Sequence, residues 1–586
     1  MNIGSFEIYE KKVIIKLHDR VCETPEELLS SKIFEEILNR YLQDLSKRHS
    51  LLLNIFDKSG FYDKEIHLLI ETFKFLQKMA GQLVPNVVKG AEVFLRDPNL
   101  LNDFVEELYN YWRGYERFIL CDSTGSDLDK RPYRVFNSTI EQLGHLIRSI
   151  YRNIQANITK THPRIYRQVI AGGEVATISI PRKMPFPSPI FDKLNKISMI
   201  RQILLYPPLI LNPPMNKRSG KFERVNVNPL TLVELDSEEW LCYPAKVGSL
   251  LILIYFHKKF LELGLSLCNL FKMADDEELK RKPDAVYLFG VPGDALDKLA
   301  AYPTVFYDDQ ENDLLVAAVP NRDEFGYFGY LKKMVLTLHN IKMMKSGILP
   351  FHGALVRIIL KGNREATILF IGDTGAGKSE TLEAFRELGH DLIQDLIIIA
   401  DDMGSLTTGE GGSIIGYGTE IGAFLRLDDL QPGYALGQID RAIIMNANQV
   451  NARIILPVTT YENVIKGHQV DFILYANNYD GIDEEHPIIE RFDSPDQAVK
   501  VFREGTVMSK GTTTSTGLVH SYFANIFGPP QYKELHEPLA HKFFEIFFQQ
   551  GIFVGQMRTR LGLSGWERKG PEEAAKELLQ VIQQQE

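Results

Sequence analysis

A strand, a glycine-rich turn and a helix are predicted in immediate succession near residue 375. Residues 368–371 are an apolar run of strand type, and residues 379–388 repeat apolar side chains at helical spacing. The turn between them, residues 372–379, reads G-D-T-G-A-G-K-S and fits the phosphate-binding P-loop pattern G-x-x-x-x-G-K-[ST]. This pattern has meaning only with a strand before it and a helix after it, and the chain supplies both. The sequence therefore predicts an α/β nucleotide-binding domain around this turn.

The residue types in the turn suit a densely anionic ligand. Gly372, Gly375 and Gly377 allow the backbone to turn tightly and to aim its N–H groups inward, and the following helix adds the positive end of its dipole. We expect Lys378 to reach the β- and γ-phosphates and the Ser379 hydroxyl to bind Mg²⁺. The predicted triphosphate-binding residues are Gly372, Asp373, Thr374, Gly375, Ala376, Gly377, Lys378 and Ser379.

Two adjacent carboxylates follow the next predicted strand. Residues 396–399 are an apolar run, and Asp401 and Asp402 come shortly after it. Carboxylates at a strand end beside a phosphate-binding turn are suited to hold Mg²⁺ or to accept a proton from an attacking hydroxyl. We therefore expect Lys378, Asp401 and Asp402 to act on the phosphoryl group.

Two segments upstream of the turn carry further ionisable side chains. Residues 327–334 read Y-F-G-Y-L-K-K-M, and residues 347–358 read G-I-L-P-F-H-G-A-L-V-R-I, with His352 near their centre. Taken singly, such lysines are typical of a solvated surface, and a lone histidine in an apolar stretch is typical of a core residue with its hydrogen bonds satisfied. Their order ahead of the turn favours a different interpretation.

In order, these segments resemble the phosphoenolpyruvate carboxykinase family. The shared order is Y-x-G-x-x-K-K, a short stretch ending in His, G-x-[ST]-G-x-G-K-[ST], and a strand followed by Asp-Asp, over about residues 326–586. Thr374 stands where that family's P-loop has serine. Residues 511–530 also look like the family's lid and core region. The resemblance implies a carboxykinase-like, P-loop-containing nucleotide-binding domain of the α/β class, with ATP as the phosphoryl donor.

The family's functional residues carry over to single positions of this sequence. The resemblance implies that Lys333, His352 and Asp402 hold a catalytic Mn²⁺. A lysine ligand must be neutral, so the metal would have to lower its pKa strongly. The resemblance also implies that Tyr327 lies near the substrate and CO₂, and that Arg491 lies near the transferred phosphoryl group.

The chain also resembles a second family, the HPr kinase/phosphorylases, which shares the nucleotide-binding fold but has different sequence motifs. The runs G-D-T-G-A-G-K-S-E-T, H-G-A-L-V and A-D-D match it more closely than they match the carboxykinases. In that family the acidic pair serves the metal and the base that deprotonates a serine hydroxyl, which implies the role of base for Asp401. That family lacks the metal-binding lysine segment, so this chain combines features of both.

The substrate side departs from the carboxykinase pattern. That family grips its carboxylate substrate with an N-terminal arginine, usually in a T-G-R-S-P-type stretch. The nearest stretch here is S-T-G-S-D-L-D-K-R-P-Y-R at residues 123–134, where Arg131 or Arg134 is the candidate substitute. The first 160 residues resemble neither family, so the acceptor stays open.

The rest of the chain indicates two further regions. Thr24, Pro25 and Glu27 combine a helix N-cap, a first-turn proline and a capping box, and helical spacing recurs over 64–83 and 100–120. Strand-like and proline-punctuated stretches then follow. The predicted organisation is a mostly helical region over 1–160, a mixed α/β domain over 161–325, and a nucleotide- and metal-binding catalytic domain over 326–586.

Composition disfavours several kinds of partner. A formal net charge of −10 gives no general attraction to nucleic acid or to an anionic membrane. The start of the chain lacks the apolar core of a signal peptide, and charged residues interrupt the apolar-rich stretch 250–271. None of the four cysteines forms a C-x-x-C pair, which is typical of a reducing compartment. We therefore expect a cytoplasmic protein that binds neither nucleic acid nor membrane.

Three functions remain open on the sequence. The first is an enzyme that moves the γ-phosphoryl group of ATP onto a small carboxylate or enolate oxygen, with oxaloacetate and phosphoenolpyruvate as the implied substrate type. The second is a kinase that phosphorylates a hydroxyl of a metabolite or a protein. The third is a nucleotide-responsive regulator or scaffold whose effector surface is the helical region 1–160. ATP, Mg²⁺ and Mn²⁺ are the expected cofactors, and the sequence sets no oligomeric state.

Overall fold

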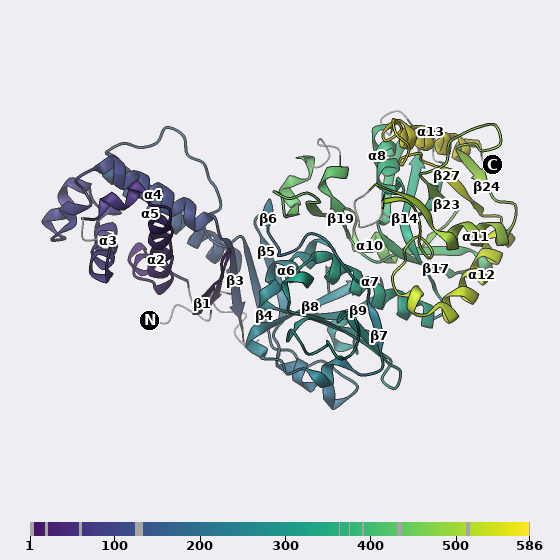
Figure 1. Cartoon of the computed structure of the whole chain (residues 1–586), viewed down its shortest axis with the longest axis horizontal. Helices are drawn as coiled ribbons and strands as arrows, with labels where there is room; N and C mark the ends of the chain where they lie inside the picture. Colours follow the sequence, from purple (N-terminus) through teal and green to yellow (C-terminus); the bar gives the residue numbers. More distant parts are fainter. Residues whose placement is uncertain are drawn as a thin grey trace. The chain divides into compact units, whose positions relative to one another are not determined.

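The chain forms two compact units in the computed structural model (Figure 1). Unit 1 comprises Met1–Pro181 and Ser198–Leu209, and unit 2 comprises Arg182–Ile197 and Ile210–Glu586. The boundary expected at residue 160 falls inside unit 1, and the boundary expected at residue 325 falls inside unit 2. The structure describes residues 5–17, 21–57, 61–123, 133–362, 364–373, 375–388, 392–430, 436–510 and 516–584.

Unit 1 is an α/β fold built on five strands. In spatial order these are β1 (Ser5–Ile8), β2 (Lys12–Leu17), β3 (Glu116–Asp122), β4 (Val175–Ile180) and β5 (Met199–Leu205). Strands β2, β3 and β4 run parallel, while β1 pairs antiparallel with β2 and β5 pairs antiparallel with β4. Because β4 pairs with β3, unit 1 extends beyond the expected boundary at residue 160.

The helices of unit 1 pack with these strands. They are α1 (Pro25–Leu29), α2 (Lys32–Lys47), α3 (Asp63–Leu76), α4 (Pro98–Arg113) and α5 (Phe136–Thr159). The predicted capping box is present: the backbone N–H of Glu27 donates to Oγ1 of Thr24 at 3.2 Å, and the backbone N–H of Thr24 donates to Oε2 of Glu27 at 3.3 Å. The helical spacing expected over 100–120 ends at Arg113, and β3 follows it. A strand buried on both faces lacks the alternation that would mark it in the sequence.

Unit 2 contains two large groups of strands with a helix between them. The first group, in spatial order, is β8 (Trp240–Val247), β9 (Leu250–His257), β11 (Ala285–Val291), β13 (Leu314–Pro320), β12 (Val305–Asp309) and β7 (Glu223–Val225). Helix α7 (Phe328–Lys345) contacts β8, β11 and β13 of this group, and β14 and β17 of the second. It is therefore buried on nearly all sides, which explains why its sequence has little amphipathic character.

The second sheet of unit 2 carries the glycine-rich turn. Its spatial order is β22 (His468–Gln469), β18 (Ile414–Gly418), β17 (Met403–Thr408), β14 (Leu349–Leu360), β15 (Glu365–Ile371), β23 (Phe472–Asn477), β27 (Phe553–Arg558) and β24 (Ile489–Arg491), with β16 (Ile393–Ala400) also paired to β14. Strands β15, β23 and β27 are parallel, so their carboxyl ends meet at one edge.

Helices cover both faces of the second sheet. Helices α8 (Lys378–Leu388) and α13 (Lys569–Gln584) share an apolar core with Leu474 of β23. The next residue, Tyr475, points the other way and packs on Phe502 of α11 (Pro495–Glu504), with ring centres 5.5 Å apart. Phe502 in turn packs on Phe544 of α12 (Lys533–Gln549). This layered arrangement of helices on a largely parallel sheet belongs to the α/β class, as predicted.

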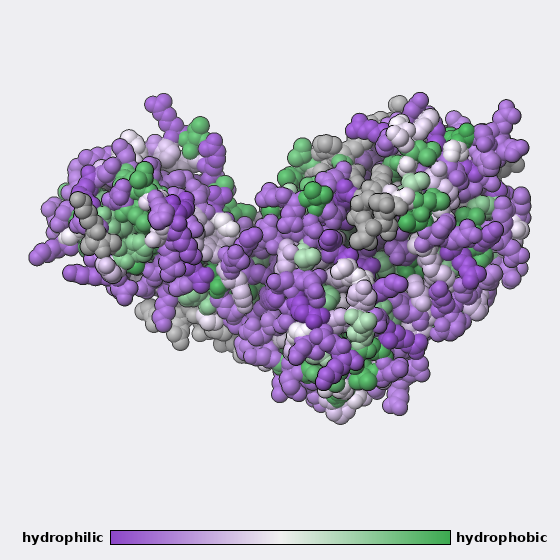
Figure 2. Space-filling view, in the orientation of Figure 1, coloured by the Kyte–Doolittle hydropathy of each residue, from purple (hydrophilic) through white to green (hydrophobic). Residues whose placement is uncertain are grey.

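Two smaller elements flank the second sheet. A small sheet holds β19 (Gly422–Arg426), β21 (Arg453–Pro457) and β20 (Ile443–Met445), and a two-stranded ribbon holds β25 (Thr506–Lys510) and β26 (Thr516–His520). Hydrophilic side chains dominate the visible surface, with apolar side chains in small groups (Figure 2). Every helix in the described part of the chain is too short or too polar to cross a membrane.

Candidate functional site

The predicted glycine-rich turn connects β15 to α8 at the carboxyl edge of the second sheet. Gly375 and Gly377 have φ values of +82° and +101°, a region that glycine adopts without strain. A side chain at Gly377 would also clash, because its Cβ would lie 2.7 Å from Oγ1 of Thr559. The shape of the turn therefore depends on these glycines. Thr374 lies outside the described residues.

Side chains from two neighbouring strands hold the turn. Nδ2 of Asn478, which follows β23, donates to the carbonyl of Gly375 at 2.9 Å. Oγ1 of Thr559, which follows β27, donates to the carbonyl of Ala376 at 2.8 Å. The turn is thus tied to the same parallel strands that form the edge on which it lies.

Lys378 and Ser379, the two residues predicted to contact the phosphates and Mg²⁺, begin α8. Lys378 is buried, and its amine donates to the carbonyls of Gly372 and Asp373, the latter at 3.1 Å. Burial lowers the pKa of Lys378, and an anionic ligand would favour its charged form again. Ser379 is exposed, so its hydroxyl is accessible to a hydrated cation.

Asp402 is the centre of a largely buried ion-pair cluster. Its Oδ2 lies 2.8 Å from Nζ of Lys332, and its Oδ1 lies 3.0 Å from Nε2 of His352. The register of β14 and β17 creates the second contact, because it pairs His352 with Met403, the residue after Asp402. Nδ1 of His352 donates to the carbonyl of Ala524, which fixes the orientation of the ring. The structure thus brings together His352 and Asp402, two of the predicted metal ligands.

The two adjacent lysines of α7 have opposite environments. Nζ of Lys332 lies 2.8 Å from Asp402 and 3.1 Å from Oε1 of Glu420. Burial alone would lower the pKa of Lys332, but these carboxylates outweigh it and raise that pKa. Burial and, after it, the nearby Arg218 lower the pKa of Lys333 to about 8, against the pull of Asp402. Lys333 is therefore the lysine of the pair that comes closer to the neutral amine a metal requires.

The pKa values of the adjacent Asp401 and Asp402 are shifted in opposite directions. Burial raises the pKa of Asp401. Burial acts in the same direction on Asp402, but Lys332 and His352 outweigh it and hold the pKa of Asp402 well below its ordinary value. Two neighbouring carboxylates with pKa values pushed apart can divide the roles of proton acceptor and permanent anion.

Glu420 is a functional candidate that the sequence analysis did not single out. Its side chain is fully buried against Lys332. Burial raises the pKa of Glu420 to about 7, and Asp402 adds to the rise while Lys332 opposes it. Glu420 lies in a glycine-rich stretch without periodicity, and the pairing of β17 with β18 brings it to Lys332. No local sequence pattern predicts such a contact.

Two arginines lie near Tyr327 at the start of α7, and Lys333 lies near one of them, Arg218. Burial raises the pKa of the Tyr327 phenol, and Arg453 and Arg218 both lie close enough to oppose that rise. The Cζ of Arg218 is 5.5 Å and the Nζ of Lys333 is 4.8 Å from the centre of the Phe527 ring. Within the described ranges, none of these three cations forms an ion pair with a carboxylate. Nε of Arg453 is buried without a hydrogen-bond partner there.

Arg218 and Arg453 were both missed in the sequence. Arg218 lies in the loop N-K-R-S-G-K, which is typical of solvated surface charge. The backbone N–H of Ser219 donates to the phenol oxygen of Tyr330 at 3.1 Å, which holds this loop against α7. No pattern in the residues around Arg453 on β21 predicts that it lies near Tyr327.

The structure does not bring Arg491 to this group. Arg491 is exposed on β24 at the edge of the second sheet, and its Cζ lies 5.5 Å from the ring of Phe553 at the start of β27. Strands β23 and β27 separate β24 from β15, about 14 Å at the usual strand spacing. Of the two arginines considered for the substrate, Arg131 lies outside the described residues and Arg134 is exposed in unit 1.

The predicted metal ligands form an unusual set. Within the described part of the chain, no group of three or more His, Cys, Asp or Glu side chains is arranged to hold a metal ion. The set predicted here has one histidine, one aspartate and one lysine. A metal bound by His352 and Asp402 would therefore depend on the neutral form of Lys333 for its third protein ligand.

No protein-family model matches this chain, and no curated protein matches it. The arguments about function therefore rest on the residues and geometry described above.

Proposed function

We propose that unit 2 transfers a phosphoryl group between ATP at residues 372–379 and an oxygen of a small carboxylate, of the oxaloacetate and phosphoenolpyruvate type. The observation that carries this proposal is a group of half-buried cations that have no carboxylate partner within the described residues: Arg218 and Arg453 near Tyr327, and Lys333 near Arg218. A cation withdrawn from water without a counter-ion is unfavourable. Three of them together favour a ligand with more than one negative charge.

The nucleotide side of the proposed site needs positioning and charge neutralisation. Backbone N–H groups of the turn and the amino end of α8 suit the phosphates. Lys378 would leave the carbonyls of Gly372 and Asp373 and move to the β- and γ-phosphates, which restores its full charge. The exposed hydroxyl of Ser379 would contact the Mg²⁺ that accompanies ATP.

The acceptor side has residues that fit a divalent cation such as Mn²⁺. The low pKa of Asp402 keeps it anionic, and Nδ1 of His352 is bound to the backbone so that Nε2 faces Asp402. Burial makes the amine of Lys333 easier to deprotonate. Together these three side chains would hold the ion, which supplies stabilisation of negative charge on the acceptor oxygen when bound.

Arg453 is the arginine that we assign to the transferred phosphoryl group, in place of Arg491. Its guanidinium lies beside Tyr327, the residue proposed to lie against the acceptor. A preorganised cation aimed at developing negative charge is usually the largest contribution to phosphoryl transfer. Arg218 lies near the same tyrosine and would bind an acceptor carboxylate.

A hydroxyl kinase is the second candidate, and the split between the two aspartates favours it. Burial raises the pKa of Asp401, so Asp401 is a better proton acceptor than its neighbour Asp402. A hydroxyl acceptor needs such a base, whereas an enolate or a carboxylate does not. An Asp401→Asn variant should therefore lose hydroxyl transfer entirely, but keep transfer to an enolate oxygen.

The direct test is the synthesis of oxaloacetate. The full chain is incubated with Mn²⁺, ADP, phosphoenolpyruvate and bicarbonate, and oxaloacetate is measured by coupled reduction. We expect oxaloacetate to form, and to disappear in an Arg218→Gln variant. Arg224→Gln is the matched control, because Arg224 is exposed and rests on Tyr532 away from Tyr327. Tight ATP binding with no oxaloacetate, together with phosphorylation of a hydroxyl acceptor, would favour the kinase instead.

A further inference from the structure

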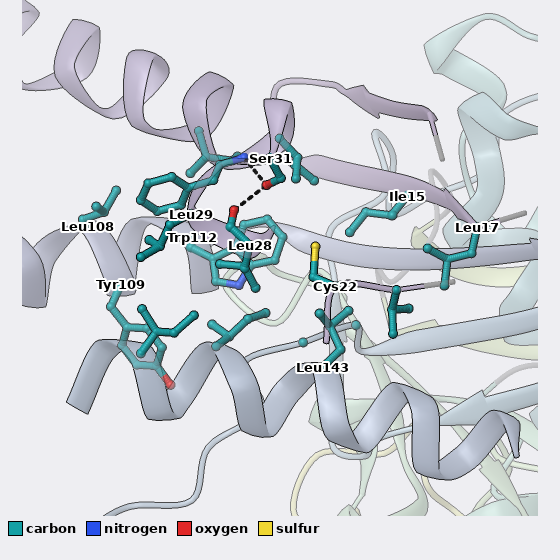
Figure 3. Close-up of a pocket in the computed structure, with 18 of the residues that line it drawn as sticks. Ile15, Leu17, Cys22, Leu28, Leu29, Ser31, Leu108, Tyr109, Trp112 and Leu143 are labelled. Atoms are coloured by element: carbon teal, nitrogen blue, oxygen red, sulfur yellow. Dashed lines mark hydrogen bonds between the residues drawn. The ribbon is translucent and has the colours of Figure 1, made fainter. Parts of the chain in front are cut away.

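Unit 1 contains a cavity of about 150 Å³ that the proposed function does not use (Figure 3). It lies between strand β2 and helices α1, α2, α4 and α5. Figure 3 shows Leu17, Leu29, Leu108 and Leu143 lining it from these elements. Protein interiors are packed almost without voids of this size. An apolar cavity in the core is therefore a candidate ligand-binding site.

Two polar side chains in the cavity wall, those of Ser31 and Trp112, are already hydrogen-bonded to the protein. Oγ of Ser31 donates to the carbonyl of Leu28 at 2.6 Å and accepts from the backbone N–H of Phe34 at 3.3 Å, as the dashed lines in Figure 3 show. Nε1 of Trp112 donates to the carbonyl of Ala171 at 2.6 Å. A buried water needs two to four polar partners, so these walls favour an apolar occupant over water.

The cavity is accessible from the surface. Leu28, Ile33, Phe34 and Tyr109 contribute to its wall and are only half-buried. An occupant can therefore enter without unfolding unit 1, and part of it can remain at the mouth.

Arginine side chains gather at Tyr109, one of the half-buried wall residues. The Cζ of Arg113 lies 5.7 Å from the centre of the Tyr109 ring. Burial raises the pKa of Tyr109, and Arg113, Arg148 and Arg152 lie close enough to oppose the rise. Nε of Arg113 and Nε of Arg148 are buried without a hydrogen-bond partner within the described ranges. None of these three arginines forms an ion pair with a carboxylate there.

We propose that unit 1 binds a small amphiphilic carboxylate, whose hydrocarbon tail fills the cavity and whose anionic head pairs with Arg113, Arg148 and Arg152. An apolar cavity of about 150 Å³ in another protein holds a benzene-sized guest, which sets the tail at about six carbon atoms. The apolar walls select the tail, and the positive charge of the three guanidinium groups, which have no carboxylate partner within the described ranges, selects the head. This site would respond to a small carboxylate independently of any chemistry in unit 2.

Calorimetric titration of the full chain tests the ligand class. Hexanoate should bind with one site per chain, and acetate, which lacks the tail, should not bind. Hexanol, which lacks the charge, should bind about tenfold more weakly than hexanoate, because a hydrogen bond to a charged group is lost. Absence of hexanoate binding, or equal affinity for hexanol, would overturn the proposal, as would binding to anionic vesicles without binding to monomeric hexanoate.

Three variants locate the site. Ile150→Phe places a larger side chain in the cavity wall and should weaken hexanoate binding, while an unchanged unfolding temperature shows that unit 1 still folds. Arg148→Gln should weaken hexanoate about tenfold and leave hexanol unaffected. Arg164→Gln is the control, since Arg164 is exposed and outside the wall. Unchanged hexanoate affinity in both Ile150→Phe and Arg148→Gln would place the binding elsewhere and refute the assignment.

Discussion

Arg117 in unit 1 and Arg218 in unit 2 are both arginines whose pKa is lowered by burial, but their surroundings differ. Nη2 of Arg117 lies 3.1 Å from Oε1 of Glu174, and its other guanidinium nitrogens donate to backbone carbonyls, including that of Gly172 at 2.8 Å. Arg218 has aromatic neighbours instead, with its Cζ 5.0 Å from the ring of Phe222. Within the described residues it has no carboxylate partner.

This difference separates a structural charge from a charge that is suited to a ligand. The hydrogen bonds of Arg117 are satisfied by the protein, so its removal should damage the fold. Arg218, Lys333 and Arg453 form no ion pair with a carboxylate within the described residues, so their removal should damage ligand binding or catalysis and leave the fold intact. The predictions below test this distinction, from the largest expected effect to the smallest.

Removal of the structural charge should have the largest effect. Arg117→Met leaves Glu174 largely buried without its partner, and breaking a buried pair in this way costs about 3–5 kcal/mol. Hydrogen exchange of the full chain should therefore accelerate in β3 and β4 of unit 1. The control Arg164→Met, at an exposed position, should change stability by less than about 0.5 kcal/mol. Unchanged exchange in β3 would show that Arg117 is not a structural charge.

A pair of matched arginines tests the catalytic side of the comparison. Arg453 and Arg491 both stand on strands and both lie about equally far from a phenylalanine ring, 5.4 Å for Arg453 and 5.5 Å for Arg491. Arg453→Gln should lower kcat/KM for phosphoryl transfer about 10²–10³-fold, because a group aimed at developing charge is lost. Arg491→Gln should leave it unchanged. The reverse result would restore Arg491 to the role that the resemblance implied.

The sequence predicted the local parts of the site well. Strand β15 and helix α8 form on either side of the glycine-rich turn as expected, and Thr24 caps α1 as expected. Such features depend on neighbours within a few residues, where turn geometry and helix capping act. His352 and Asp402 were predicted together through the order of motifs, and the register of β14 and β17 brings them into contact.

The non-local parts of the site could not be predicted in this way. Arg218 and Arg453 lie more than a hundred residues from Tyr327 in opposite directions along the chain, and only the tertiary fold gathers them. The lysines of α7 looked like surface charges in the sequence. Because α7 packs between two sheets, its sequence has no polar face that would distinguish buried from exposed lysines. Strand β3, buried along its length, lacked the alternation that marks a half-exposed strand.

A pH series tests whether Lys333 is held without a counter-ion. Its pKa is about 8 in the folded chain and about 10.5 in the unfolded chain, so the folded state binds fewer protons between these values. The free energy of unfolding should therefore rise with pH across this window relative to Lys333→Met, by an amount on the order of 1–3 kcal/mol. Below pH 8 the difference should be constant, because the lysine is protonated in both states.

Urea denaturation at pH 8 and pH 10, followed by circular dichroism, measures this change in the full chain. Lys280→Met is the control, because Lys280 is an exposed lysine paired with Glu277 and should show no such rise. A wild-type stability that stays parallel to that of Lys333→Met between the two pH values would mean that Lys333 remains fully charged, and that it is not suited to bind a metal.

The smallest effect is expected where a polar group is satisfied, neutral and exposed. Thr24→Ala removes the hydroxyl that accepts from the backbone N–H of Glu27, and the loss of such an N-cap costs about 1 kcal/mol. Because α1 carries Leu28 and Leu29 of the cavity wall, amide exchange should accelerate within residues 25–29 and the affinity for hexanoate should fall slightly. Thr24→Ser keeps the hydroxyl and should restore both. If Thr24→Ala destabilised unit 1 as strongly as Arg117→Met, the large loss of stability in Arg117→Met could not be attributed to a buried, unpaired Glu174.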